Sequence, residues 1–167
     1  MARSSAWERL TVRPLEAGDV AAARALFAFV GAGEPPAAAQ EGWGAYDAER
    51  IVGALVIERA GGSAMLHGPA VAAPAGADTE SAVEAAAQLV EQALVHAAAA
   101  KIDTVFVRPQ GLDRVWVRLG FIPVPEAELA ESFRGRPGIG LFGWRGGSAL
   151  WSAAARGRDR RTSPAFR

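Results

Sequence analysis

The feature that most constrains the fold is a long helical pattern between strand-like segments. Residues 81–100 have the sequence SAVEAAAQLVEQALVHAAAA, in which apolar side chains recur at helical intervals along one stripe. Strand-like stretches precede this helix, and the strand-like run IDTVFVRP follows it. A helix with one apolar stripe has to bury that stripe against another layer. The sequence therefore predicts a sheet with this helix packed on one of its faces.

The N-terminal patterns predict a strand and a second helix. Residues 10–14, LTVRP, alternate apolar and polar side chains like a strand with one buried face. The helical pattern AAARALFAFV follows, with Asp19 placed to cap its start and Gly31 placed to end it. Residues 31–40 contain too much Gly and Pro for a regular element, which leaves a loop or a broken helix.

The middle of the chain predicts a meander of three strands. WGAY, IVGALVIER and SAMLHGPAV are separated by short turns, one of them at Gly61 and Gly62, and Pro69 marks a bulge or the end of pairing. After the long helix, IDTVFVRP predicts a strand, LDRVWVRLG a short helix, and FIPVP with GLFGWRGGSALW one or two further strands. This order predicts an α/β fold, with a mixed, mostly antiparallel sheet of six to seven strands and helices on both faces.

Length and composition predict one domain. A chain of 167 residues, 50% of them hydrophobic, can bury one sizeable core and is short for two. We therefore expect a single domain at 1–150 and an Arg-rich tail at 151–167, where five arginines accompany one acid. Because large aromatic side chains accompany these arginines, we expect residues 142–167 to dock on the domain, on a second copy of the chain or on a protein partner.

Charge and composition argue against several classes of partner. The 18 basic and 18 acidic residues give a net charge of zero, so no overall field draws the chain to nucleic acid or to an anionic membrane. The chain has no Cys, and neither His67 nor His96 stands in a metal-binding spacing, so we expect no metal. The first residues lack a signal-peptide pattern and no apolar run is of membrane-spanning length, which predicts a cytoplasmic protein.

Three stretches give the chain a resemblance to a known family. RLTVRPLEAGDVAAARALF looks like the opening strand and helix of the GNAT superfamily of acyl-CoA-dependent N-acyltransferases. ERIVGALVIERAGGSAMLHGPAVAAP is similar to the central meander of that family, and VWVRLGF to its ending F-Y-x-x-x-G-F. The resemblance covers roughly residues 10–125 and rests on the order of elements as much as on the letters.

The resemblance implies a fold, a cofactor and an activity. In this family two central parallel strands diverge in a V-shaped splay, and acetyl-CoA lies between them. The strand SAMLHGPAV would expose backbone groups to the pantetheine arm, and the loop before the long helix would hold the diphosphate at the helix N-terminus. The implied activity is transfer of an acetyl group to an amine, on a small molecule or a protein, by direct attack on the thioester. The implied cofactor-binding residues are Val71, Ala77, Asp78, Thr79, Glu80, Ser81 and Ala82.

The diphosphate loop departs from the family pattern. Glu80 stands where the family has a glycine, and Asp78 adds a second carboxylate. A carboxylate about 5 Å from a phosphate oxygen is repelled by roughly 3 kcal/mol at an effective dielectric near 20, which weakens binding about a hundredfold. Alternatively, these residues only cap the helix, with Ser81 and Glu84 spaced as a capping box. Binding through backbone amides survives if the carboxylates point to solvent.

The ending VWVRLGF places Trp116 where the family has a tyrosine thought to protonate the departing CoA thiolate. An indole N–H can donate a hydrogen bond to the sulfur but cannot give up its proton at useful pH. The alternative is a large aromatic plug that fills the cofactor wedge. This departure favours a second hypothesis, a catalytically inactive GNAT-like domain that serves as an assembly or regulatory subunit.

Two residues of the meander are candidates for a general base. His67 has a suitable unperturbed pKa and lies on the strand next to the expected splay, although a lone His on an apolar strand is commonly a hydrogen-bonded core residue. Glu58, near the end of the neighbouring strand, can act through water, or it is simply an exposed acid at a strand end. Both pairs of alternatives stay open at the level of sequence.

Overall fold

The computed structural model describes residues 10–37, 39, 41–73, 76, 78–109, 111–134 and 150–155. Its strands are β1 (Leu10–Pro14), β2 (Glu41–Asp47), β3 (Arg50–Ala60), β4 (Ser63–Val71), β5 (Thr104–Val107), β6 (Ile122–Pro123) and β7 (Trp151–Ala154). Its α-helices are α1 (Val20–Phe29), α2 (Thr79–Ala99) and α3 (Asp113–Arg118). Three short 3₁₀ helices are η1 (Ala17–Asp19), η2 (Glu126–Glu128) and η3 (Glu131–Phe133).

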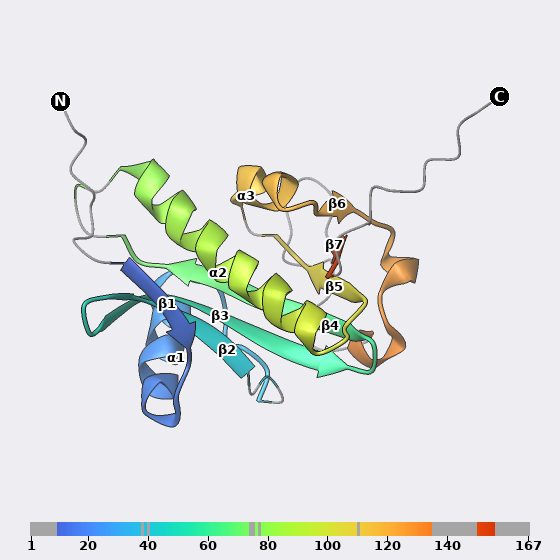
Figure 1. The fold of residues 1–167 in the computed structure, drawn as a ribbon, viewed down its shortest axis with the longest axis horizontal. Coiled ribbons are helices and arrows are strands. Elements are labelled where there is room, and N and C mark those ends of the chain that lie inside the picture. Colours follow the sequence, from blue (N-terminus) through green and yellow to red (C-terminus); the bar gives the residue numbers. More distant parts are fainter. Residues whose placement is uncertain are drawn as a thin grey trace.

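The described strands form one sheet of seven, in the order β1-β2-β3-β4-β5-β7-β6. Neighbouring strands pair antiparallel except for β4 and β5, which pair parallel. A parallel pair needs a crossover connection, and α2 provides it. The predicted fold class, a mixed and mostly antiparallel sheet with helices on both faces, is confirmed (Figure 1).

The two parallel strands separate partway along β4. Their pairing runs from Ser63 opposite Thr104 to Leu66 opposite Val107 and then stops, whereas β4 continues to Val71. In the same stretch the register of β4 against β3 shifts between Ala54 and Val56, which is the bulge expected near Pro69. Among the described residues, 67–71 of β4 therefore have no ladder partner on the β5 side, and this gives the V-shaped splay of the predicted fold.

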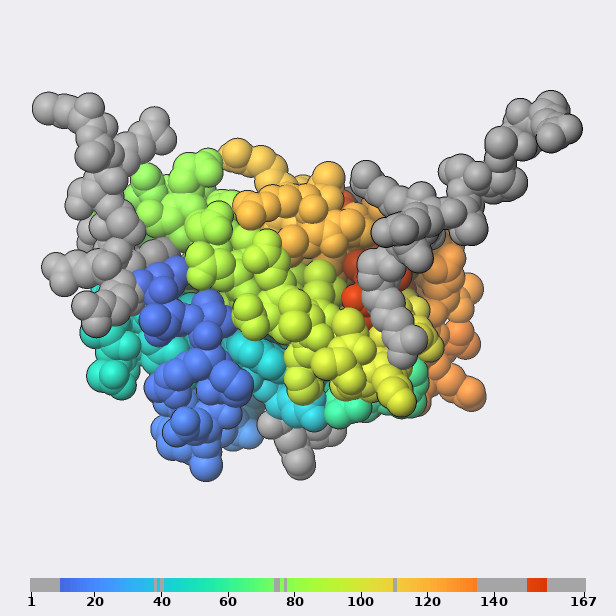
Figure 2. Space-filling view, in the orientation of Figure 1, coloured from blue at the N-terminus to red at the C-terminus, as the bar shows by residue number. Residues whose placement is uncertain are grey.

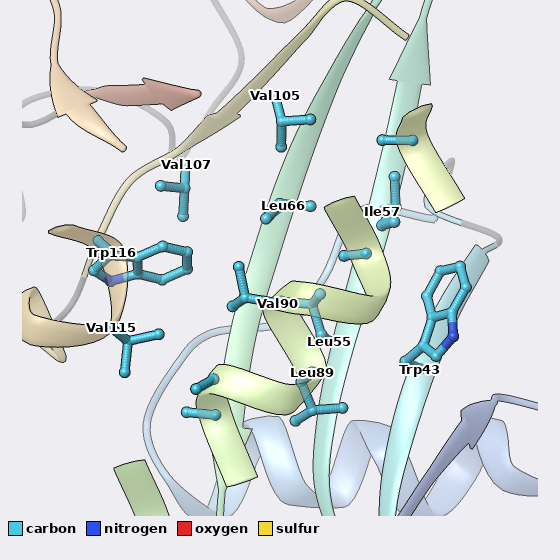
Figure 3. Packing of buried hydrophobic residues seen from close by; sticks show 14 of the residues in the cluster. Trp43, Leu55, Ile57, Leu66, Leu89, Val90, Val105, Val107, Val115 and Trp116 are labelled. Carbon is cyan, nitrogen blue, oxygen red and sulfur yellow. The ribbon is translucent and has the colours of Figure 1, made fainter. Parts of the chain in front are cut away.

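Each face of the sheet has its own apolar cluster. The long helix α2 runs across one face, where its buried residues Ala86, Ala87 and Val90 confirm the apolar stripe predicted from the sequence (Figure 1). The core on this face also contains Trp43, Leu55, Ile57, Leu66, Val105, Val107, Val115 and Trp116 (Figure 3). We call the opposite face the α1 face, because Leu26 and Phe27 of α1 pack there.

The α1 face carries a second apolar cluster farther along the sheet. Met65 of β4 and Phe106 of β5 pack there with Leu129 and Phe133, which belong to the segment that contains η2 and η3. This segment and α1 cover different parts of the same face. Met65, the cross-strand partner of Glu58, packs in the second cluster, whereas Val56, two residues before Glu58 and on the same face, packs in the α1 cluster. The strip between them is where the polar residues discussed below lie.

The start of α2 differs from the predicted capping box. The helix begins at Thr79, two residues earlier than expected, and Asp78 is its N-cap residue. The Asp78 carboxylate accepts hydrogen bonds from the Ser81 backbone N–H (2.9 Å) and from the Ser81 hydroxyl (2.7 Å). Glu84 does not take part, because it forms an ion pair with Arg118 at 3.4 Å. The expected box is thus replaced by an aspartate cap.

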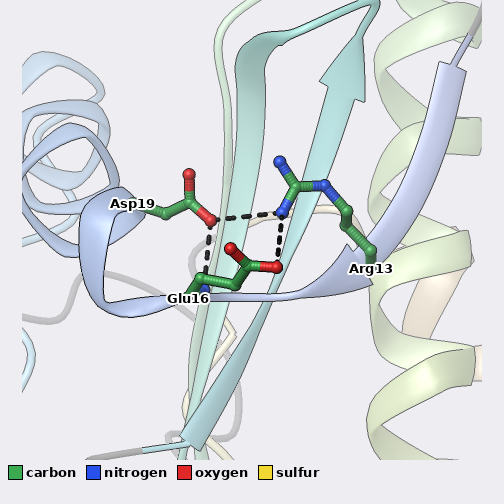
Figure 4. Close-up of polar contacts among 3 residues, drawn as sticks. All are labelled: Arg13, Glu16 and Asp19. Atoms are coloured by element: carbon green, nitrogen blue, oxygen red, sulfur yellow. Dashed lines mark hydrogen bonds and ion pairs between the residues drawn. The ribbon is translucent and has the colours of Figure 1, made fainter.

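The start of α1 also differs in detail from its prediction. Asp19 occupies the N-cap position, but its side chain makes no hydrogen bond to the helix that follows. Instead its carboxylate accepts a hydrogen bond from the Glu16 backbone N–H (3.0 Å) and pairs with Arg13 (3.4 Å), as Figure 4 shows. These contacts stabilise η1 and the turn from β1 into α1. Gly31, at the other end of α1, has a φ of 69°, as its predicted terminating role requires.

The first residues of the expected tail, beyond the boundary expected at residue 150, belong to the sheet. Trp151–Ala154 form β7, which lies between β5 and β6 and pairs antiparallel with both. The sheet extends past the predicted boundary because Ala153 and the partly buried Trp151 pack against the core below α2. Residues 135–149 and 156–167, which include Phe142, Trp144 and most of the predicted docking surface, lie outside the described residues.

Candidate functional site

The two general-base candidates meet on the α1 face beside the splay. Glu58 lies opposite Met65 in the register of β3 and β4, and His67 lies opposite Val56, so both side chains emerge from the same face. His67 is also the first residue of β4 beyond the last pair with β5. The structure thus places an ionisable pair at the point where the parallel strands begin to separate.

Glu58 is not the exposed strand-end acid that the sequence allowed. Its side chain is only 3% exposed, and its carboxylate lies 3.1 Å from Nε2 of His67. β3 continues to Ala60, and the apolar cluster around Met65 and Phe133 covers this part of the sheet, so the acid lies inside the structure rather than at its end. His67 is likewise the hydrogen-bonded, largely buried histidine that was one of its two alternatives.

Burial determines the charge state of His67. Desolvation lowers the pKa of His67 to about 4, so the imidazole is neutral at physiological pH. A neutral ring has one N–H and one lone pair, and the Glu58 carboxylate favours the N–H at Nε2. No other hydrogen bond to this ring is found among the described residues. The lone pair at Nδ1 is then available to accept a proton.

The low pKa of His67 predicts a pH dependence of stability. Between pH 6.5 and about 4 the unfolded chain binds a proton at His67 that the folded chain does not, so the free energy of unfolding falls as pH falls through this window. The full shift corresponds to about 3 kcal/mol. We expect denaturant unfolding at pH 7 and pH 4 to show this extra loss in the wild type and not in His67→Gln. Equal losses in the two proteins would contradict the assignment.

Trp116 is a residue of the core in the structure. Its side chain is fully buried, its indole N–H donates to the Gly111 carbonyl (3.0 Å), and its ring packs edge-on against Phe121. With the N–H already bonded, Trp116 has no donor for a thiolate, and the predicted catalytic role is not supported. Figure 3 shows the indole beside Val107, the last residue of β5, on the α2 face of the sheet.

The first turn of α2 is partly filled by its own side chains. The Ser81 backbone N–H already donates its hydrogen bond to the Asp78 carboxylate, so it is not available to a ligand. Ala82 lies in the second turn of the helix. The amides of Thr79 and Glu80 precede the first intrahelical hydrogen bonds and have no acceptor within the helix. Val71 ends β4 as predicted and packs at the margin of the α2-face core. Ala77, the remaining predicted residue, lies outside the described residues.

Glu80 points along the surface toward α3. Its carboxylate pairs with Arg114 at 3.5 Å, and its side chain is 60% exposed. Arg118 on the next turn of α3 forms ion pairs with Glu84 and Glu91 (3.4 and 3.7 Å). Figure 2 shows α2 and α3 side by side on this face. The repulsion expected from Glu80 is thus reduced by solvent and by an adjacent cation.

Arg108, an arginine that was not among the candidates predicted from the sequence, lies at the splay. Arg108 follows β5 directly and forms a two-pronged ion pair with Glu126 of η2, with Nη2 and Oε2 separated by 2.9 Å. The hydrogen bond from Arg108 holds the pKa of Glu126 below its usual value. The signal in the sequence was a charged residue at the end of the buried run TVFV, but its partner lies 18 residues away in a segment without a regular pattern.

The described residues line a partly open cavity on the α1 face. It has a volume of about 300 Å³ and lies between α1, the loop after it and the sheet. Its walls are mainly apolar and include Leu15, Val20, Phe27, Pro36 and Val56, with Glu16, Arg24 and Glu41 as charged members. Because Val56 lies opposite His67 in the register, the cavity and the Glu58–His67 pair are neighbours on one face.

Neither a metal centre nor a membrane span is found in the described part of the chain. No group of three or more His, Asp or Glu side chains there is arranged to hold an ion. Within the same residues, no helix has both the length and the apolar character needed to cross a bilayer.

Comparisons with known proteins agree on the architecture. No protein-family model matches the sequence, and no curated protein matches it. Among solved structures, a GNAT-family acetyltransferase from Staphylococcus aureus superposes with a TM-score of 0.65 at 9% identity, over 89% of this chain and 100% of that one. A GNAT-family N-acetyltransferase from Escherichia coli in complex with CoA gives a TM-score of 0.62 at 17% identity, over 89% and 82%.

A third similar structure belongs to a longer protein. N-acetylglutamate synthase from Neisseria gonorrhoeae, complexed with CoA and N-acetyl-glutamate, gives a TM-score of 0.67 at 15% identity and covers 89% of this chain. The match spans only 35% of that protein. Similarity at these identities shows that the folds are the same, and the chemistry has to come from the residues of the site.

Proposed function

We propose that this chain, which has the GNAT fold, is an acyl-CoA-dependent N-acetyltransferase in which His67 is the general base and Glu58 supports it. The observation that carries the proposal is the buried Glu58–His67 pair at the start of the splay. Removing two ionisable groups from water costs several kcal/mol per charge, and an apolar pair of similar volume would fit an apolar sheet face. Ionisable groups retained in such positions mark functional sites.

The chain's own residues provide the acid–base step. Acetyl-CoA supplies an acetyl thioester, whose carbonyl carbon an amine attacks directly. His67 takes up the proton that the amine nitrogen loses, at Nδ1, and the Glu58 carboxylate at Nε2 stabilises the resulting imidazolium. With its N–H donated to Gly111, Trp116 supplies no proton, so the thiol proton of the released CoA comes from solvent.

The splay fits an acyl-CoA chain, and the α2 N-terminus fits a diphosphate less fully. In the part of the chain that the structure describes, residues 67–71 of β4 have no ladder partner on the β5 side, so backbone groups are available to the amides of a pantetheine arm. At α2, the amides of Thr79 and Glu80 and the helix dipole favour an anion, but Asp78 already occupies the Ser81 amide. We propose that the diphosphate binds through the first two amides.

Glu80 is expected to weaken cofactor binding only modestly. For an exposed carboxylate about 5 Å from a phosphate oxygen, the repulsion in water is about 1 kcal/mol, or about fivefold in affinity. This replaces the hundredfold expected from sequence, because Glu80 is exposed and paired with Arg114. We predict that Glu80→Gln tightens acetyl-CoA binding about fivefold by calorimetry. Glu91→Gln, on the same helix about three turns farther on, is the matched control, and equal affinities in all three proteins would contradict the placement.

Acetyl transfer itself tests the proposal. Purified protein is incubated with acetyl-CoA and a panel of amines that includes amino acids, their amides, polyamines and lysine-containing peptides, and release of the CoA thiol is followed. The proposal expects turnover above the uncatalysed rate with at least one class, together with mass-spectrometric detection of the N-acetyl product. Absence of turnover across the panel, with acetyl-CoA bound, would favour the alternative below.

One observation favours the second candidate function, a GNAT-like domain without catalysis. The indole of Trp116 lies beside Val107, where the parallel strands begin to separate, and is fully buried with its N–H bonded. An inactive domain would retain the fold and lose cofactor binding. The buried Glu58–His67 pair would then persist without a chemical role, and for this reason we favour the enzyme.

A further inference from the structure

The residue that follows the last β4–β5 pair on β5 is Arg108, and its counterpart on β4 is His67. The pairs Met65 with Phe106 and Leu66 with Val107 fix the register of the two strands. Met65 and Phe106 belong to one cluster on the α1 face, so side chains two residues farther along each strand emerge on that same face. Arg108 and His67 therefore stand on opposite sides of the splay and face the same layer.

The guanidinium of Arg108 is held in one orientation. Both of its terminal nitrogens, Nη1 and Nη2, donate to the Glu126 carboxylate, one to each oxygen. A two-pronged pair of this kind fixes the plane of the guanidinium as well as its position. Glu126 is itself placed by η2, whose segment packs through Leu129 onto Phe106. The guanidinium of Arg108 therefore presents its remaining edge, formed by Nε and one Nη nitrogen, in a defined direction.

The third nitrogen of the guanidinium lacks an acceptor. Nε of Arg108 is buried and has no hydrogen-bond partner among the described residues, although the side chain as a whole is 22% exposed. A buried donor without an acceptor is destabilising, and a ligand oxygen placed there relieves that cost. The edge formed by Nε and a neighbouring Nη nitrogen has the geometry that a carboxylate accepts in two bonds.

We propose that Arg108 binds the carboxylate of the acceptor, so that the acceptor is an amino acid or another amine that carries a carboxylate close to its nitrogen. This inference rests on the proposed function. Arg108 and His67 each follow directly after the last paired residues, where neighbouring strands still lie about 5 Å apart, so a carboxylate at Arg108 leaves the amine of the same small molecule within reach of His67. The class excludes polyamines and lysine side chains within proteins, which have no carboxylate next to the amine.

The apolar cavity extends the site on the other side of His67. Its wall residue Val56 is the cross-strand partner of His67, and its other walls include Phe27 and Val20 of α1. An amino acid with its carboxylate at Arg108 and its nitrogen at His67 would direct its side chain along the α1 face toward this cavity. Amino acids with apolar side chains are therefore the expected members of the class.

The test compares acceptors that differ only in the carboxylate. We would measure kcat and KM for acetylation of leucine, phenylalanine and methionine, and for the corresponding amides. For the wild type we expect kcat/KM to be on the order of 100-fold higher for the acids than for the amides, because a neutral amide cannot form an ion pair with the Arg108 guanidinium. In Arg108→Gln this preference should fall to near unity, because the KM for the acids rises far more than the KM for the amides. Arg50→Gln, which alters a surface arginine paired with Asp47, is the matched control and should keep the preference.

Structural roles for Arg108 give different results. If Arg108 serves only to hold Glu126 and η2, then Arg108→Gln lowers stability and affects acids and amides equally, and this overturns the proposal. Arg108→Lys is the second variant in case the glutamine variant does not fold, because lysine keeps the charge opposite Glu126 and lacks the Nε edge. It should lose the preference for acids as well. A lysine variant that keeps the full preference would also overturn the proposal.

A binding measurement separates this inference from the proposed function. Calorimetric titration of the wild type with each acid and its amide needs no turnover. Binding of the acids that is lost in Arg108→Gln, without acetylation of any amine, would support the Arg108 site and contradict the transferase. Acetylation of acids and amides at equal rates would support the transferase and overturn the Arg108 site.

Discussion

His67→Gln is expected to lower kcat/KM for acetyl transfer by about 10²- to 10³-fold, the usual contribution of a general base. Glutamine has a size and polarity that allow it to hydrogen-bond Glu58, so the fold should persist, but its amide cannot take up a proton at useful pH. The loss should appear mainly in kcat, because acetyl-CoA is expected to bind elsewhere along the splay. The measurement is steady-state kinetics of CoA release with a saturating acceptor.

Glu58→Gln complements this prediction. The substitution keeps the hydrogen bond to His67 but removes the charge that stabilises the imidazolium, so we expect a smaller loss of about 10- to 100-fold in kcat. Because Glu58 acts through His67, the double variant should be little worse than His67→Gln alone. Unfolding by denaturant and acetyl-CoA binding serve as controls for folding. Wild-type rates in His67→Gln would remove His67 from the mechanism.

Trp116→Ala is expected to be the most destabilising single substitution, with a loss of about 4 kcal/mol in the free energy of unfolding. The side chain is 1% exposed, packs against Phe121 and belongs to the core on the α2 face, so its removal leaves a large cavity. A loss of this size is a substantial fraction of the stability of a typical domain. The measurement is the midpoint of denaturant unfolding, which reports stability as long as the dependence of the unfolding free energy on denaturant concentration is the same in both proteins.

Trp116→Phe is the matched control for the packing argument. It keeps an aromatic ring in the core and removes the indole N–H, whose acceptor Gly111 is exposed and can bond water instead. We expect a loss of about 1 to 2 kcal/mol, from the smaller ring and one hydrogen bond. If alanine cost no more than phenylalanine, Trp116 would not be the core residue described. If Trp116→Ala also gained acetyl-CoA affinity, the indole would be acting as a plug.

The order of elements was predictable because it depends on local patterns. Strand alternation in β1, the Gly61–Gly62 turn and the apolar stripe of α2 each arise from a few neighbouring residues, and the structure contains all three. The end of the domain was not predictable in the same way. β7 is short, follows a Gly-rich stretch, and is held in the sheet by β5 and β6 rather than by a pattern of its own.

The site was predictable in its residues and not in its connections. His67 and Glu58 were both chosen from sequence, but their contact depends on how β3 and β4 pair around the register shift after Ala54. The burial of Glu58 depends on the cluster around its cross-strand partner Met65, which includes Phe133 from far along the chain. Arg108 was missed for a related reason, since its role follows from the end of β4–β5 pairing and from Glu126, and neither leaves a local pattern.

Isothermal titration of the purified protein with acetyl-CoA tests the central claim most directly. The claim is that the splay between β4 and β5, with the amides at the start of α2, receives an acyl-CoA. We predict a saturable binding heat with one site per chain. The affinity for acetyl-CoA should be higher in Glu80→Gln and unchanged in Glu91→Gln. No heat at millimolar acetyl-CoA, with the protein folded, would contradict the account.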